Sequence, residues 1–483
     1  MLQTGVSCVI LGLVIPTAVV RAQEQSGNQA NPPAPPVQAS NSSETTANSA
    51  QALNANAQGI MPDTLSLSGA QGLSLAVPAG ARSFWQPLFN VTSTFDTNPP
   101  SANATAGTTT WTSLYGGLRL RQVSRRSDLT LNYLGGGLTS NDGTTSTSLI
   151  QQLEFGEKRS WRRTTVSFFD LLSYLPEASF GFSLPTALAL PSGQGISLEP
   201  VLIPNQTVLT TRGQRTSNTS LAELDTALTA RTSLTFVGAY ALLHFSDNGF
   251  LNLSDTIFQA GLNRQIGRND TIALLYRLNA YRYDNFDQSI VGHVVQVSYG
   301  RRIAGRLAFQ VAAGPEVAFL RTPVPPATTS LGVATTSSST RAYWTLDTSL
   351  TYQIQRTAFE LAYDHSLSGG AGVLAGAIND QVSGSVSNQF SSAFKGGLVL
   401  GYARNGALST PAPTPSNQVY NYWFAGMSLS HRLNRSMDIS FNYQAQIQDS
   451  NAEFCVGVNC GRSFARHAVS VGFNWLSRPV PIG

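Results

Sequence analysis

The 483-residue chain is poor in charged residues, in lysine and in cysteine. Only 12% of its residues are charged, about half of the roughly 25% that is usual in soluble proteins. No long apolar run takes their place, because the single continuous run, residues 6–20, is too short to cross a bilayer as a helix. The formal charge of +4 is too small to indicate a nucleic-acid partner. The composition therefore argues against an ordinary soluble domain, a helical membrane protein and a nucleic-acid-binding protein.

The short apolar run predicts export from the cytoplasm. Val20-Arg21-Ala22 follows it with the small-x-small pattern of a cleavage site, so residues 1–22 are interpreted as a signal peptide. No Lys or Arg precedes the run, which is atypical of such peptides. Residues 23–82 are rich in Gln, Asn, Ala, Ser and Pro, and we predict a disordered periplasmic leader there.

Only two cysteines remain after that cleavage, Cys455 and Cys460. In an exported chain, two cysteines separated by four residues predict a disulfide that closes a loop. Metal ligation is the alternative, although no His or acidic cluster adjoins them. We predict no metal and no cofactor.

From residue 83 onward, polar and apolar residues alternate along many short segments. Between residues 437 and 447, Met437, Ile439, Phe441 and further apolar residues take one parity, and Asp438, Ser440 and further polar residues take the other. Successive side chains of a strand point to opposite faces of a sheet. One face of each strand is therefore apolar and the other is polar, as in a soluble sandwich or in an outer-membrane barrel.

The turns between these segments decide between the two architectures. Short turns, seven of the eight carrying arginine, alternate with longer loops rich in Gly, Pro, Ser and Thr. This asymmetry is typical of bacterial outer-membrane barrels, whose short turns lie at the periplasmic end. We expect an all-β fold, a transmembrane antiparallel up-and-down β-barrel of about 18 strands (16–20) over residues 83–478, with a tail at 479–483. The expected strands are 84–95, 109–123, 128–140, 147–157, 163–176, 216–229, 232–246, 254–266, 270–284, 289–302, 306–320, 341–354, 357–367, 380–389, 393–404, 418–432, 436–449 and 463–476.

Some details resemble known porins. The third long loop, roughly Glu177 to Arg215, is the longest, and Pro176-Glu177 with Phe180-Gly181 resembles the Pro-Glu-Phe-Gly sequence of general diffusion porins. The resemblance implies that this loop folds into the barrel and narrows it. The terminal Phe usual in porins is absent, and Phe473 with Trp475 would supply the signal for the barrel-assembly machinery. Phe95-Asp96-Thr97-Asn98 is similar to a loop entry in β-barrel porins linked to exopolysaccharide.

Charged residues collect on the parity that would face the lumen. On the lipid face near the midplane, each basic residue would cost roughly 2–4 kcal/mol. These side chains could filter solutes by charge, or they could brace the interior through hydrogen bonds, and an acidic and a basic patch could impose a transverse field. The candidate pore-lining residues are Arg119, Arg121, Glu154, Glu223, Asp225, Arg277, Glu316, Asp347, Glu360, Asp364, Lys395 and Asp438.

No catalytic site is predicted. Asp364-His365-Ser366 places an acid, a base and a nucleophile side by side, but neighbours on a strand point to opposite faces and cannot converge. The sequence therefore favours a non-enzymatic porin that passes small hydrophilic solutes, embedded in outer-membrane lipids. An exopolysaccharide or cell-envelope export barrel and a structural surface barrel are the alternatives, and a homotrimer is left open.

Overall fold

The computed structural model describes residues 83–97, 108–140, 148–175, 215–246, 251–284, 288–303, 306–324, 335–370, 374–408, 418–451 and 463–482. These residues form β-strands joined by turns, and no helix among them is long and apolar enough to cross a membrane. The predicted signal peptide and leader, Cys455 and Cys460, and almost all of the third long loop lie outside the described residues.

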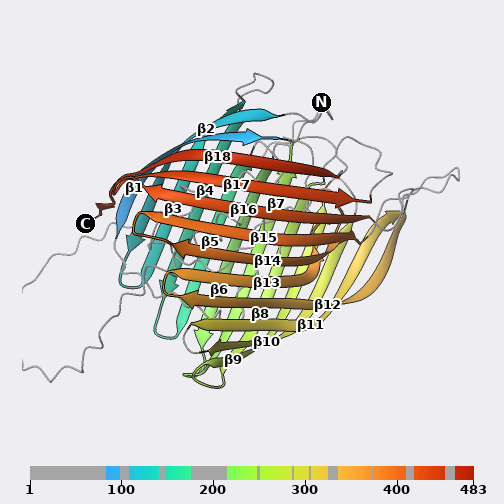
Figure 1. The fold of residues 1–483 in the computed structure, drawn as a ribbon. Helices are drawn as coiled ribbons and strands as arrows, with labels where there is room; N and C mark the ends of the chain where they lie inside the picture. Colours follow the sequence, from blue (N-terminus) through green and yellow to red (C-terminus); the bar gives the residue numbers. More distant parts are fainter. Residues whose placement is uncertain are drawn as a thin grey trace, which may run out of the picture. The chain divides into compact units, whose positions relative to one another are not determined.

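Eighteen strands and one short extension build a single antiparallel sheet that closes on itself (Figure 1). Strand β1 pairs with β2 on one side and with β18 on the other, which completes the circle. Closure leaves no free sheet edge, as a lipid environment requires. The strands are β1 (Phe84–Asp96), β2 (Thr109–Val123), β3 (Ser127–Ser140), β4 (Ser148–Ser160), β5 (Thr164–Leu175), β6 (Arg215–Ala227), β7 (Thr232–Phe245), β8 (Leu253–Gln265), β9 (Asp270–Tyr283), β10 (Ser289–Ile303), β11 (Leu307–Val324), β12 (Thr335–Ile354), β13 (Thr357–Ser368), β14 (Ala377–Gln389), β15 (Phe394–Ala407), β16 (Val419–Arg432), β17 (Met437–Ser450), β18 (Phe464–Leu476) and β19 (Val480–Pro481).

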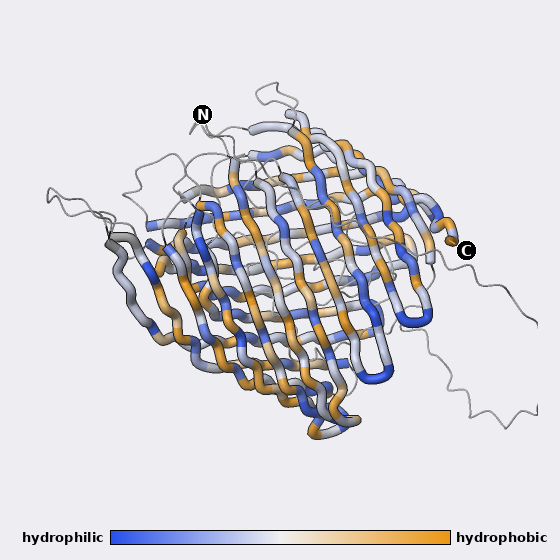
Figure 2. Tube along the Cα trace, turned by 180° about the vertical axis from the view of Figure 1, so that it is seen from behind, coloured by the Kyte–Doolittle hydropathy of each residue, from blue (hydrophilic) through white to orange (hydrophobic). Residues whose placement is uncertain are grey.

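The sheet carries its apolar side chains on the outside. On β17, Ile439 and Ile447 are 40% and 47% exposed, whereas Ser440 and Gln446 are 3% and 1% exposed. A soluble protein would show the reverse, with isoleucine buried and glutamine in water. The tube coloured by hydropathy shows apolar residues recurring along the strands of the wall nearest the viewer (Figure 2). An outer surface of this kind matches the apolar band that outer-membrane barrels present to lipid.

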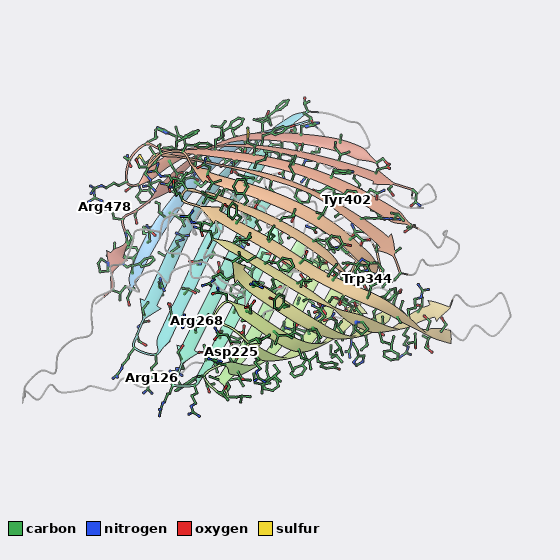
Figure 3. The ribbon with its side chains drawn as sticks, turned by 60° about the horizontal axis from the view of Figure 1, so that its bottom comes forward. Arg126, Asp225, Arg268, Trp344, Tyr402 and Arg478 are labelled. Atoms are coloured by element: carbon green, nitrogen blue, oxygen red, sulfur yellow. The ribbon has the colours of Figure 1, made fainter. Side chains whose placement is uncertain are left out.

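The eight short turns all join an even strand to the odd strand that follows it. Arg126 and Arg268 lie together at one end of the barrel, whereas Trp344 and Tyr402 lie toward the other (Figure 3). The seven arginine-bearing turns therefore form one rim, and the predicted alternation of short turns with longer connections is confirmed. Strand β1 begins and β18 ends at this rim, where Val480 and Pro481 of the predicted tail pair with Trp85 and Phe84.

Two local predictions were wrong. Residues 158–160, expected as a turn, end strand β4, and the turn lies at Trp161 to Arg163. The loop expected between the strands 306–320 and 341–354 is also shorter, because β11 extends to Val324 and β12 begins at Thr335. Ser and Thr run through this added segment, and Thr favours strands. Their polarity misled the prediction, since a strand that projects beyond the membrane needs no apolar face.

Candidate functional site

All twelve predicted pore-lining residues share the inward parity of their strands. Arg119, Arg121, Glu223 and Glu316 are buried, and the other eight are half-buried. Their strand neighbours on the opposite parity include the exposed Leu118, Leu224 and Leu361. The structure thus places the candidate charges on the inner wall and large apolar side chains on the outer wall of the same strands.

The two arginines of β2 are compensated locally. Arg121 donates to both carboxylate oxygens of Asp128 on β3, at 3.0 and 2.7 Å. Arg119 interacts electrostatically with Glu154 on β4, which also accepts from Asn132 at 3.2 Å. The predicted basic patch on this wall is therefore paired with acidic groups and contributes little net charge.

Several acidic groups lie on the inner wall of β11 to β13. Asp347 and Asp364 stand directly opposite each other on neighbouring strands, an arrangement in which like charges repel. Arg277 interacts electrostatically with both Glu316 and Asp347. Ser366 donates to Asp364 at 2.8 Å. Carboxylates are therefore concentrated on this wall, which is called the acidic wall.

The strand order places these two walls opposite each other. In a closed ring of 18 strands, β11 is the ninth strand from β2 in either direction, because 11 − 2 = 9 and 18 − 9 = 9. The acidic wall of β11 to β13 therefore faces the wall that carries Arg119 and Arg121. The geometry needed for a transverse field is present, but the local pairing of Arg121 with Asp128 weakens its basic side.

The connection between β13 and β14 folds over the inside of the barrel at the end opposite the arginine rim. Tyr283 of β9 donates to the Gly369 carbonyl at 2.9 Å, and Gln288 donates to the Ala375 carbonyl at 2.8 Å. Because β9 is not a sheet neighbour of β13, these contacts run across the interior. The connection therefore narrows the barrel at this end.

Apolar packing reinforces this inward connection. The buried cluster joins Leu367 and Ala375 to residues of β7 through β11, including Tyr281 and Ile290. Gly376 has φ +85°, and a Cβ there would lie 2.3 Å from Ile290 Cδ1. Only glycine meets both demands, since it tolerates positive φ and has no side chain. The resemblance to general diffusion porins implied a narrowing by the third long loop, most of which lies outside the described residues. The connection between β13 and β14 was not predicted, and its signal was the apolar Leu374 in a glycine-rich turn.

The Asp364-His365-Ser366 triplet does not form a catalytic triad. Asp364 and Ser366 lie on the inward parity, whereas His365 has the outward parity, stacks on Trp344 with ring centroids 4.0 Å apart, and bonds to Asp380. The predicted opposite orientation of His365 and Ser366 is confirmed.

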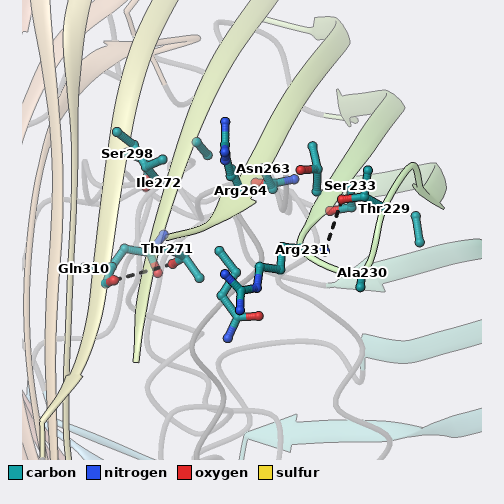
Figure 4. A pocket seen from close by; sticks show the side chains of 15 residues that line it. Thr229, Ala230, Arg231, Ser233, Asn263, Arg264, Thr271, Ile272, Ser298 and Gln310 are labelled. Carbon is teal, nitrogen blue, oxygen red and sulfur yellow. Dashed lines mark hydrogen bonds between the residues drawn. The ribbon is translucent and has the colours of Figure 1, made fainter. Parts of the chain in front are cut away.

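A small polar hollow of about 120 Å³ lies on the inner wall near the arginine rim (Figure 4). It lies where β6, β8 and β10 end and where β7, β9 and β11 begin, and it is lined by Ser298, Asn263 and Gln310 among others. Thr271 closes part of it by donating to the Gly300 carbonyl at 3.5 Å. No carboxylate lines it, so the hollow is distinct from the acidic wall.

A buried ion pair at the closing seam was not predicted. Arg466 of β18 donates from Nε to both carboxylate oxygens of Asp96 on β1, at 3.1 and 2.9 Å, and its Nη2 bonds to the same carboxylate. Both side chains are almost fully buried. Because the two residues stand 370 positions apart in the chain, the sequence offered no local signal for this pair.

No protein-family model matches the chain, and no curated protein matches it. Similar solved structures include the outer membrane protein OpdK from Pseudomonas aeruginosa, which is 10% identical at a TM-score of 0.40, with 81% of this chain and 99% of that chain covered. Pseudomonas aeruginosa OccK2 (OpdF) is 9% identical and has a TM-score of 0.40, with 81% of this chain and 98% of that chain covered. Acinetobacter baumannii OccAB2 is 9% identical at a TM-score of 0.42, with 82% and 98% covered. At these values, the similarity assigns no solute to this chain.

The wall itself identifies the class of protein. A closed antiparallel barrel of 18 strands, apolar outside and polar inside, with short turns at one end, has the architecture of porin-like barrels of the bacterial outer membrane. The residues of this chain meet each of these criteria without reference to its structural neighbours.

Proposed function

We propose that this barrel is a channel through which small hydrophilic solutes diffuse passively across the outer membrane. The observation that carries the proposal is a burial pattern opposite to that of a soluble protein. Glutamine and serine of β17 face inward, whereas isoleucine faces outward. An 18-stranded barrel is wide enough to enclose an aqueous passage. Polar side chains along the inner wall support a hydrated interior.

The twelve candidate charges of the inner wall, taken by themselves, favour cations over anions. Four of them are basic and eight are acidic, so their formal sum is 4 − 8 = −4. Arg121 is compensated by Asp128, whereas Asp347 and Asp364 of the acidic wall are cross-strand neighbours of like charge. Rings and patches of carboxylates select cations in channels.

The arginine rim suggests the orientation of the barrel. Short turns lie at the periplasmic end of outer-membrane barrels, and arginines there would lie beside anionic head groups of the inner leaflet. The inward connection between β13 and β14 would then narrow the external mouth. Strand β18, with Phe473 and Trp475, would engage the assembly machinery.

Reconstitution of the purified mature chain tests the proposal. Liposomes containing the protein are expected to swell in small sugars, at rates that fall as the sugar grows, and planar bilayers are expected to show stepwise conductance. A control barrel variant, Gly406→Ala, changes a position with open space around it and should behave like the wild type. Absence of both swelling and conductance would instead support a structural surface barrel.

A further inference from the structure

The outer face of β5 and β6 interrupts the apolar band. Between Thr216 and Ala222, the outward positions of β6 hold Thr216, Asn218, Ser220 and Ala222, with no large apolar side chain. On β5, Asp170 has the outward parity, between the exposed Phe168 and Leu172. Asp170 stands near the middle of its strand, far from either rim. The outward positions of β5 and β6 around Asp170, Asn218 and Ser220 form the polar outer face.

The carboxylate of Asp170 is held by side chains of β6. Asn218 Nδ2 donates to Oδ1 at 3.0 Å and to Oδ2 at 3.3 Å, and Ser220 Oγ donates to Oδ2 at 2.9 Å. A carboxylate offers about four acceptor sites, and hydrocarbon supplies no further donor. A charged group at this depth is therefore poorly suited to lipid, although its neighbours reduce the mismatch.

The inner face of β5 and β6 also differs from that of strands such as β17, because it carries apolar side chains. Phe169, Leu171 and Leu221 point inward and form a buried apolar cluster with Val237, Ala239, Ala241 and Ile257 of β7 and β8. Elsewhere, as on β17, glutamine and serine take the inward positions. Strands β5 and β6 thus differ from β17 on both faces, with apolar side chains inside and polar ones outside.

Beside the polar outer face, β7 has a glycine whose outward side is open. Ala222 of β6 stands opposite Gly238 of β7, and a Cβ added to Gly238 would meet nothing within 4 Å. Around it stand the exposed Phe236 and Phe258, whose ring centroids are 6.5 Å apart, together with Tyr240. Small residues allow close approach of a second backbone, and aromatic residues are enriched in protein–protein interfaces.

We propose that a second copy of this chain packs against the polar outer face through a two-fold contact. In a two-fold contact the same surface meets itself, so it must be self-complementary. The donors of Asn218 and Ser220 are directed to Asp170 of their own copy, which leaves the Asn218 amide oxygen and the Ser220 lone pairs as acceptors, whereas a Thr216 hydroxyl can donate and accept. The Thr216 hydroxyl of each copy can therefore donate to one of these acceptors, or to a remaining acceptor site of Asp170, in the other copy.

The first test measures the mass of the full-length mature protein extracted with native lipids. The wild type is expected to contain two copies per particle. Asp170→Leu combined with Asn218→Leu and Ser220→Val makes the face lipid-like, and this variant is expected to contain one copy. The matched control, Ser93→Ala with Thr348→Val, removes outward polar groups from β1 and β12 and should retain two copies. Single-copy wild-type particles would overturn the proposal.

Cross-linking gives a second test that does not depend on the triple variant folding. Ala222→Cys, in a Cys455→Ser and Cys460→Ser background, is treated in intact membranes with a short bifunctional maleimide. A cross-linked product of twice the chain mass is expected, whereas Leu274→Cys on the outer face of β9 should give none. A product between Ala222→Cys and a different protein, or no product, would contradict the contact between copies.

Discussion

Replacement of two acidic residues should reduce the preference of the channel for cations. Asp347 and Asp364 are cross-strand neighbours on the inner wall, and Asp347→Asn with Asp364→Asn removes both charges with little change in volume. The sum of the twelve candidate charges then changes from −4 to −2, since two of the eight acidic residues are neutralised.

The size of the effect follows from Coulomb's law. A monovalent cation about 7 Å from each carboxylate in water gains roughly 0.6 kcal/mol per carboxylate. Screening at 0.1 M salt, where the Debye length is about 10 Å, reduces this to about 0.3 kcal/mol each. The pair thus enriches cations about threefold and depletes anions about threefold, because 0.6 kcal/mol is close to one RT. The cation-to-anion permeability ratio should fall by at most about eightfold.

Reversal potentials in planar bilayers under a salt gradient measure this ratio. The fall should be larger at low salt, because screening weakens. Asp170→Asn is the matched control, since it makes the same chemical change on the outer face, and its ratio should equal that of the wild type. If the double variant conducts with an unchanged permeability ratio, the acidic wall does not set selectivity, and the reasoning from the inner charges fails.

Further predictions concern the seam, the inward connection, the membrane face and the cysteines. Arg466→Met removes the cation that pairs with the buried Asp96, so the free energy of unfolding in detergent should fall by about 3–5 kcal/mol. The control Arg478→Met, at an exposed position, should change this free energy little. Equal stability of Arg466→Met and the wild type would refute the role of the pair. Gly376→Val introduces a side chain against Ile290 at a positive φ, so the connection between β13 and β14 should be displaced and single-channel conductance should rise. The control Gly406→Val should leave the conductance unchanged. A wild-type conductance for Gly376→Val would show that this connection does not narrow the passage. Leu400→Arg on the outer face of β15 should cost roughly 2–4 kcal/mol of stability in lipid. Ser385→Arg, at the same level on the inner face of β14, should cost far less. Equal losses of stability in the two variants would argue against the assigned inner and outer faces. Cys455 and Cys460 should resist alkylation until a reductant is added, and immediate labelling of both would exclude their disulfide.

Strand number and most strand positions could be predicted because the two faces of the wall meet different solvents. Alternation such as Met437 to Ile447 fixes parity along a strand, and the arginine turns mark one rim. The strand prediction failed where a polar segment forms a strand outside the apolar band. Residues 335–340 were assigned to a loop because they are polar, although they pair with β11 beyond the apolar band.

The interior contacts could not be predicted, because they depend on which strands face each other across the barrel. The contact of Gly369 with Tyr283 joins residues 86 positions apart, and Asp96 meets Arg466 only when the sheet closes. In the sequence, residues 163–176 and 232–246 are apolar on both parities. It did not show that Asp170 points outward, because one acidic residue in an apolar segment barely changes the pattern.

Sedimentation of the purified mature chain before and after detergent removal tests most directly whether lipid lies outside this sheet and water inside. The outward band predicts a single species in detergent that aggregates on its removal and is recovered when lipid is supplied. A chain that remained monodisperse in plain buffer would contradict the membrane barrel and the channel proposed within it.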